Sequence, residues 1–247
     1  MENDTILFTV DDIDIFAKVS HDRSPLHCNN EYARKTPYGE PVVHGILGVF
    51  ACLGKFVELD NNVFITAMEV KFFAPLFCNV CYTLSVKTVR NSEAEMIITD
   101  GETKILKIKV VYKGGLGIAI NNRQSSIPFF EMQAKDLDYN EIVQGKGYDG
   151  EYSPLIDDAF YNLLAKFGLQ SASLEYLVIL LMWSSYSVGM IVPGKQALYS
   201  DINLEIEPNL TEADLTLPIR YEVKIDKLDT RFNLLFMGFS CFSSSGV

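Results

Sequence analysis

Histidine is scarce in this chain of 247 residues, and its three copies all lie between positions 21 and 44. The second half of the chain has no histidine at all. Histidine is the side chain whose unperturbed pKa lies nearest to neutral pH, so proton transfer by an imidazole can be placed only in this short segment. Within it, Asp22 and His27 stand five residues apart around Pro25. The spacing predicts a carboxylate and an imidazole on a stiffened loop, two groups suited to moving protons.

The sequence also lacks a long hydrophobic run. It starts Met-Glu-Asn-Asp, and no apolar segment follows, so we predict no signal peptide. The longest apolar stretch, residues 174–192, carries Glu175 and several serine and tyrosine positions, and its uninterrupted part is too short to span a bilayer. We therefore predict a buried core helix in this stretch, no membrane partner and a cytoplasmic location.

Positive charge is in the minority, and it forms no basic stripe. The net charge is −11. Residues 1–130 hold 13 basic and 15 acidic side chains, whereas residues 131–247 hold 8 and 17. Nucleic acids and anionic membranes attract proteins with clustered lysine and arginine, so neither is predicted as a partner.

The chain has five cysteines, an odd number, and no secretion signal is predicted. This combination indicates reduced thiols in the cytosol. Cys78 and Cys81 have the spacing of half a zinc site, but there is no second pair and no histidine nearby, so we expect these two thiols to pack in the core. The three histidines and Asp22 have suitable atoms for zinc, yet their spacing matches no known motif. We predict no metal and no cofactor.

Hydrophobic periodicity predicts a buried helix followed by consecutive strands, once in each half. Such an order is typical of an α+β protein in which an antiparallel sheet wraps around a helix. In the first half we predict a strand at 5–10, a helix at 12–19 capped by Asp11 and Asp12, a helical turn at 29–35, a buried helix at 44–59, and strands at 64–73, 82–90, 96–99 and 104–112. In the second half we predict a linker with an entry strand at 113–150, a helix at 157–167 capped by Asp157 and Asp158, a buried helix at 173–188, and strands at 196–207, 219–228 and 232–243.

The two halves share the order of their elements. In each half the apolar helix precedes an alternating strand that ends in proline, at residues 63–75 and 197–208. We infer an internal repeat of about 120 residues, longer than solenoid periods, with a first domain at residues 1–125 and a second at 126–247. The second copy lacks a last strand in this pattern, so we expect it to be truncated at its C-terminus.

Five motifs follow one another in the first half, and together they resemble a known family. They are Ser20-His21-Asp22-Arg23-Ser24-Pro25-Leu26-His27, Tyr32-Ala33, Tyr38-Gly39-Glu40-Pro41, His44-Gly45-Ile46 and Phe72-Phe73-Ala74-Pro75. The set resembles the MaoC-like dehydratases, which include the (R)-specific enoyl-CoA hydratases. Their signature reads Ser-Gly-Asp-x-Asn-Pro-x-His, then Tyr-Ala, Phe-Gly-x-Pro and His-Gly-Met. The resemblance covers roughly residues 6–112, and its specificity comes from the agreement of several pieces in order and spacing.

The resemblance implies a hot-dog fold, a long helix wrapped by an antiparallel sheet. With the repeat, it implies a double hot-dog: two antiparallel sheets, each wrapped on a long central helix, forming a pseudo-dimer. The second half would then be a degenerate hot-dog that supplies the sheet partner and part of an acyl tunnel.

The resemblance also implies roles for individual residues. Asp22 and His27 would be the catalytic acid–base pair, and the N–H of Gly45, at the start of the central helix, would receive the thioester oxygen as negative charge develops on it. Residues beside them in the motifs would contact the substrate: Ser24, Pro25, His44 and Ile46. His44 could also simply fix the start of the helix.

Two departures from the signature bear on the acid–base pair, whereas Ile46 for methionine is a mild change in an apolar position. His21 stands where the family has glycine, and Ser24 stands where it has asparagine. The ring of His21 next to Asp22 could narrow the site or change the acidity of the acid–base pair. Loss of the asparagine removes an amide that could order the loop.

Three hypotheses follow for the function. The first is a lyase that hydrates enoyl thioesters or dehydrates 3-hydroxyacyl thioesters of coenzyme A or acyl carrier protein. The second is a hot-dog thioesterase that uses Glu175 or Asp158. The third is a non-catalytic acyl-thioester binding or assembly module of a larger enzyme. A homodimer and a fusion to further domains both remain open.

Overall fold

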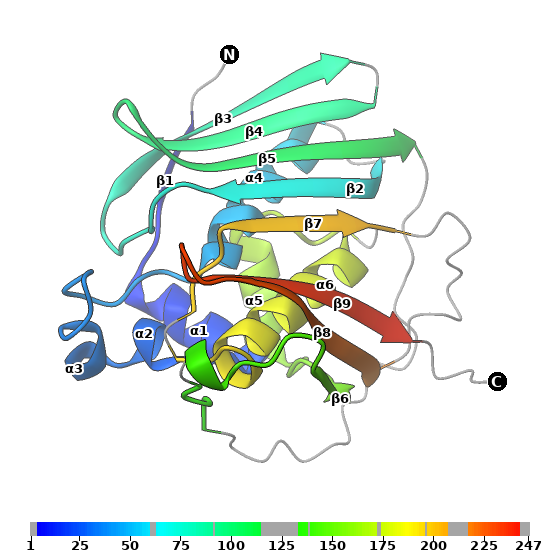
Figure 1. Cartoon of the computed structure of the whole chain (residues 1–247). Helices are drawn as coiled ribbons and strands as arrows, with labels where there is room; N and C mark the ends of the chain where they lie inside the picture. Colours follow the sequence, from blue (N-terminus) through cyan, green and yellow to red (C-terminus); the bar gives the residue numbers. More distant parts are fainter. Residues whose placement is uncertain are drawn as a thin grey trace.

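The computed structural model of the chain describes residues 4–59, 63–90, 92–114, 133–137, 139–171, 174–195, 197–206 and 217–242. It is an α+β structure with antiparallel sheets (Figure 1). The first half contains β1 (Asp4–Leu7), α1 (Val10–Ser20), α2 (Pro25–Cys28), α3 (Asn30–Ala33), α4 (Gly45–Leu59), β2 (Val63–Phe72), β3 (Cys81–Arg90), β4 (Glu93–Asp100) and β5 (Thr103–Gly114). The second half contains the 3-10 helix η1 (Tyr139–Glu141), β6 (Gly147–Tyr152), α5 (Asp158–Lys166), α6 (Glu175–Tyr186), the π-helix η2 (Ser187–Ile191), β7 (Asp201–Glu205), β8 (Ile219–Asp229) and β9 (Leu234–Phe242).

Helix α4 is the centre of the first half. Its residues are small or apolar nearly all the way round, and 11 of its 15 residues are buried. Strands β1, β3, β4, β5 and β2 lie side by side in this order, all antiparallel, and α4 contacts β2, β3, β4 and β5 (Figure 1). The buried helix and the four strands predicted after it are confirmed to within a few residues.

The second half repeats this plan with a shorter sheet. Strands β6, β8 and β9 form a three-stranded antiparallel sheet, and α6 packs against it through Trp183, whose ring lies 5.5 Å from the rings of both Tyr221 and Phe239. Ten of the twelve residues of α6 are buried, as expected for its apolar sequence. No helix in the described part of the chain has the length and apolar character needed to cross a membrane.

Strand β7 joins the two halves, because it belongs to the sheet of the first half. It pairs antiparallel with β2, with Val70 opposite Ile202 and Met68 opposite Leu204. These are the two proline-terminated strands that the sequence indicated as equivalent. Pairing of equivalent strands across a local twofold is the contact expected between two copies of one fold. The sheet of the first half therefore has six strands, and the two sheets are not divided strictly between the halves.

The start of helix α1 differs from the prediction. Asp11 and Asp12 do not cap it. Thr9 is the N-cap, and Asp12 at the third helical position accepts a hydrogen bond from the Thr9 backbone N–H at 2.8 Å, which completes a capping box. The strand predicted at 5–10 ends at Leu7, because Thr9 is the N-cap of the helix that follows. For α5 the prediction is confirmed in part: the carboxylate of Asp157 accepts from the backbone N–H groups of Ala159 and Phe160.

The prediction for the cysteine pair is wrong for one member. Cys78 is half-buried, whereas Cys81 is exposed at the start of β3, where its neighbour Tyr82 takes the inward position. Side chains alternate along a strand, so only one of two adjacent residues can face the core. None of the five cysteines forms a disulfide.

Several predictions fall outside the described residues. They are the linker from residue 115 to residue 132, the domain boundary at 125/126, the strand ends at Gln196 and Glu207, and the last residues, 243–247.

Helix α4 approaches the second half at a residue that has no side chain. Helix α4 contacts α6, and Gly54 on α4 lies against the backbone at the end of α5. A Cβ atom at position 54 would overlap the carbonyl oxygen of Phe167. The packing of the first half on the second therefore depends on the missing side chain at this position.

We expect Gly54→Ala to destabilise the protein by about 2–3 kcal/mol, the size of an overpacking defect in a core. In an exposed helix the same change usually stabilises by up to about 1 kcal/mol, so the sign itself is diagnostic. The free energy of unfolding can be measured by urea denaturation followed by the fluorescence of Trp183, the single tryptophan.

Gly114→Ala is the matched control, because an added Cβ there meets no atom within 4 Å. It should change stability by less than about 0.5 kcal/mol. Equal stabilities of the two variants would contradict the packing described for Gly54.

Candidate active site

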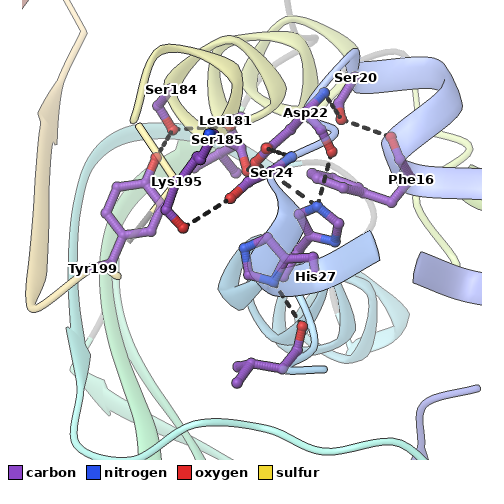
Figure 2. Close-up of polar contacts among 12 residues, drawn as sticks. Phe16, Ser20, Asp22, Ser24, His27, Leu181, Ser184, Ser185, Lys195 and Tyr199 are labelled. Carbon is purple, nitrogen blue, oxygen red and sulfur yellow. Dashed lines mark hydrogen bonds and ion pairs between the residues drawn. The ribbon is translucent and has the colours of Figure 1, made fainter. Parts of the chain in front are cut away.

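Asp22 lies in the turn that ends helix α1. His21, the helix C-cap, adopts the left-handed conformation with φ 62°. That conformation favours glycine, which is the residue the family signature has at this position. The Oγ of Ser20 donates to the carbonyl of Phe16 at 2.6 Å and accepts from the backbone N–H of Asp22 at 3.1 Å (Figure 2). These bonds fix the turn and direct Asp22 into the interior, where it is 2% exposed.

The carboxylate of Asp22 is hydrogen-bonded from two sides. Its Oδ1 accepts from the backbone N–H of Ser24 at 3.2 Å, and its Oδ2 accepts from the Oγ of Ser185 at 2.6 Å (Figure 2). Ser185 belongs to α6 of the second half, 163 residues further along the chain. Gly189, one helical turn later in η2, lies so close that a Cβ there would overlap the carboxylate. The second half of the chain therefore forms part of the surroundings of Asp22.

His27 lies on the short helix α2, with Pro25 at its first position. Its Nδ1 donates to the carbonyl of Val42 at 2.6 Å, and a carbonyl can only accept. In the neutral ring, Nε2 therefore carries the lone pair. The ring stacks on His44 with 3.9 Å between centroids, and Nε2 of His44 donates to the backbone carbonyl of Asp22 at 3.1 Å. His44 thus holds Asp22 and His27 together from behind.

Burial sets the protonation of the pair. It raises the pKa of Asp22, while the nearby charge of His27 and the hydrogen bonds from Ser185 and Ser24 act in the opposite direction. Burial lowers the pKa of His27, and the charge of Asp22 opposes this. It also lowers the pKa of His44 well below its usual range, so His44 is neutral. The two pKa values of the pair are displaced toward each other, as in sites that transfer protons near neutral pH.

Asp22 and His27 face a cavity of about 280 Å³ whose walls come from both halves of the chain. Gly45, at the start of α4, also lines it. The first N–H groups of a helix have no partner within the helix, so this wall offers hydrogen-bond donors. Most of the remaining wall is apolar, and includes Phe72, Leu76 and Leu106 from the first half and Val188 and Leu198 from the second.

The cavity separates the predicted site residues into two groups. Asp22, His27 and Gly45 line it together. The four residues predicted to contact the substrate do not line it: Ser24, Pro25, His44 and Ile46. They lie in the layer behind, where the side chain of Ser24 is 3.5 Å from the carbonyl of Lys195 and His44 is fully buried. Neighbours in a turn or helix point in different directions, so proximity in sequence did not place them at the wall.

His21 does not reach the cavity either. Its ring is buried near the backbone of Ser153 and the charge of Arg23. Burial and then the charge of Arg23 lower its pKa to about 4. Since His21 is not among the groups that shift the pKa of Asp22, the expected effect of His21 on the acid–base pair does not appear in this geometry.

Sequence reasoning missed the cavity residues of the second half. They include Ser185, Val188, Gly189, Leu198, Tyr199 and Ser200. Tyr199 stacks on Phe72 with 5.5 Å between ring centroids, and its hydroxyl donates to Ser184 at 3.0 Å (Figure 2). None of these residues carries a recognisable motif. Their only signal is membership of the apolar helix and the strand that would face a partner copy.

One group of potential metal ligands occurs within the described ranges, formed by Asp22, His27 and His44. Their ligand atoms lie within 4.8 Å of one another. Nδ1 of His27 and Nε2 of His44 are engaged with carbonyl oxygens, so each ring has one nitrogen left for a metal. The donor types suit zinc, but three buried side chains with this sequence spacing form no recognised zinc motif.

The chain contains a MaoC-like domain. Residues 2–109 match the family described as "MaoC like domain". The (R)-specific enoyl-CoA hydratase of Rhodospirillum rubrum is 27% identical to this chain over 115 residues, which is 45% of this chain and 79% of the hydratase. The resemblance inferred from the motifs of the first half is confirmed by this match.

The whole chain has the fold of MaoC-like proteins. A solved structure described as a MaoC-like dehydratase superposes with a TM-score of 0.64 at 12% identity and covers 100% of this chain and 93% of its own. A MaoC domain protein from Chloroflexus aurantiacus J-10-fl gives a TM-score of 0.64 at 10% identity, over 99% of this chain and 87% of that chain. At such identities the likeness shows the fold alone. It confirms the α+β double hot-dog, including the second half, which the family match does not reach.

We expect the stability of the protein to fall as the pH drops from about 6.5 toward 4. The pKa values of all three histidines are lowered in the folded state, that of His21 to about 4, so the unfolded chain binds more protons in this window. Each histidine contributes up to about 1.4 kcal/mol per pH unit. Asp22, whose pKa is raised, acts in the opposite direction for one proton. Urea denaturation at several pH values measures the slope.

His21→Asn provides the internal comparison, since His21 lies outside the cavity. The variant should lose about one proton of the slope between pH 6.5 and 5, whatever its absolute stability. A wild-type stability that stays constant over this window would show that the histidines are not buried in their neutral form.

Proposed function

We propose that the protein is a hydro-lyase that interconverts enoyl thioesters and 3-hydroxyacyl thioesters. The observation that carries the proposal is the convergence of Asp22, His27 and Gly45 on one cavity with apolar walls. A carboxylate, a neutral imidazole and a free helix-start N–H are the groups that addition of water to a conjugated thioester requires. The 27% sequence identity to an (R)-specific enoyl-CoA hydratase over 115 residues supports the same reaction class.

The proposed reaction begins with a water held between Asp22 and His27. Nε2 of His27 accepts a proton from this water while its oxygen attacks C3 of the enoyl thioester. Negative charge then develops on the thioester oxygen, and the N–H of Gly45 stabilises it. The protonated ring returns a proton to C2, so H and OH have been added across the double bond. Dehydration follows the same steps in reverse.

The substrate is proposed to be a thioester of coenzyme A or acyl carrier protein. Its acyl chain would lie along Phe72, Leu76 and Leu106 and against the second half of the chain, whose Val188 and Leu198 share the cavity. The second half would thus shape the acyl pocket, and the first half would perform the chemistry. This division of tasks follows the predicted domains, 1–125 and 126–247.

The thioesterase hypothesis has less support. Glu175 and Asp158 are not among the residues that line the cavity. Glu175 is buried at the first position of α6, and Asp158 is exposed beside the N-cap of α5. Both positions favour carboxylates because they lie in the first turn of a helix. A structural role accounts for each of them.

We expect Asp22→Asn and His27→Ala each to lower kcat/KM for hydration of crotonyl-CoA by about 100-fold to 10,000-fold, the usual contribution of general acid–base catalysis. The loss of absorbance of the conjugated enoyl thioester follows the reaction directly. In the wild type, activity should fall on the acid side as the pair of carboxylate and neutral imidazole takes up its first proton.

Asp14→Asn is the matched control, because Asp14 is exposed on α1 and does not line the cavity. It should retain wild-type activity. Wild-type rates in both Asp22→Asn and His27→Ala would refute the lyase proposal. Binding of crotonyl-CoA by calorimetry without turnover of any chain length would favour a non-catalytic acyl-thioester module instead.

A further inference from the structure

Residues of the second half, which has no histidine, surround one side of the Asp22 carboxylate. Ser185 Oγ donates to Oδ2 at 2.6 Å, the shortest hydrogen bond that Asp22 makes (Figure 2). Ser185 is 4% exposed, and both partners are therefore shielded from water. A short hydrogen bond from a hydroxyl to a buried carboxylate is of the stronger kind, since the acceptor carries charge.

The position of Ser185 on its helix explains how it reaches Asp22. Ser185 and Gly189 are four residues apart, so they project from the same side of the helical segment. The α-helix changes to a π-helix at Ser187, between these two residues. Such single turns of π-helix often occur where a helix is adapted to a functional site. Together, the hydroxyl of Ser185 and the missing side chain of Gly189 leave room for the carboxylate in one orientation.

A neighbouring serine shows that the contact is not a general property of this helix. Ser187 is fully buried two residues later, yet its Oγ has no hydrogen-bond partner among the described residues. A buried hydroxyl without a partner costs free energy, so burial alone does not select serine here. Ser185 differs from Ser187 in pointing at the carboxylate.

We propose that Ser185 is a positioning residue for the acid–base pair: its hydroxyl holds the Asp22 carboxylate in the orientation that faces His27 and the cavity. The inference rests on the proposed hydro-lyase function and assigns the second half a direct part in it. Ser185 acts through Asp22, and no contact with the substrate is required of it.

The other ionisable groups around Asp22 determine how loss of this hydrogen bond would change the titration of Asp22. The groups that interact electrostatically with Asp22 are His27 and Cys28 on α2, His44 before α4, Tyr152 on β6 and Tyr199 after α6. The thiol and both phenols have pKa values that burial raises, so they stay neutral over the working range. His27 therefore remains the one group that changes charge together with Asp22, and removal of the Ser185 donor should appear as a change in the titration of this pair.

Ser185→Ala tests the proposal. Without the donor, the carboxylate loses stabilisation relative to the protonated acid, so its pKa should rise by about one unit. The carboxyl carbon of Asp22 can be titrated by NMR in selectively labelled protein without any substrate. With crotonyl-CoA, the acid limb of kcat/KM should move to higher pH by the same amount, and kcat at the optimum should fall about tenfold.

Ser187→Ala is the matched control, because it removes a buried hydroxyl from the same segment and no hydrogen bond. It should leave the titration of Asp22 and the acid limb unchanged. If Ser185→Ala does not fold, Ser185→Cys replaces it: the thiol is a weak donor of similar size, and the shift should have the same direction with a smaller size.

The outcomes separate this inference from the proposed function. An unchanged Asp22 titration in Ser185→Ala or its substitute overturns the inference, even if the wild type hydrates crotonyl-CoA. Absence of turnover in the wild type with a raised carboxyl pKa in Ser185→Ala overturns the reaction instead, while the positioning contact stands.

Discussion

A buried carboxylate must be hydrogen-bonded, and this requirement organises the structure around Asp22. The turn after α1 supplies one donor from Ser24, and the central helix of the second half supplies another from Ser185. His44 binds the backbone of the same residue and stacks on His27. The carboxylate is thus satisfied only when both halves are folded and docked. The fold and the proposed chemistry share one set of contacts.

The docking itself rests on features that are easy to overlook in a sequence. Strands β2 and β7 pair across the two halves, and Gly54 lets helix α4 approach the end of α5. The strand pairing is antiparallel along five positions, from Ala67 opposite Glu205 to Lys71 opposite Asp201, and the Gly54 contact is made by backbone alone. Together they hold the second half, which carries Ser185 and Gly189, against the first half.

Much of the first half could be predicted from its sequence, because each signal there is local. The apolar helix at Gly45–Leu59, the alternating strands and the spacing of Asp22, His27 and Gly45 all lie within short windows. Local rules failed where two signals competed: Thr9 took the cap that Asp11 and Asp12 were expected to form. Motif membership also does not tell which way a side chain points, and Ser24 and Ile46 lie behind the cavity wall. The cavity wall from the second half depends on contacts between residues more than 150 positions apart, and no periodicity reports those.

The absence of histidine from the second half has a consequence for stoichiometry. In an assembly of two identical hot-dogs, each copy must carry both the acid–base pair and the seat for its partner's carboxylate, and two equivalent centres result. In this chain the two sets of groups lie on different halves: Asp22 and His27 belong to the first half, and the hydroxyl of Ser185 belongs to the second. On the proposed function, these 247 residues therefore carry one acid–base centre instead of two. On the same proposal the two central helices have different tasks: α4 presents its first N–H groups to the cavity at Gly45, and α6 presents the hydroxyl of Ser185 to Asp22.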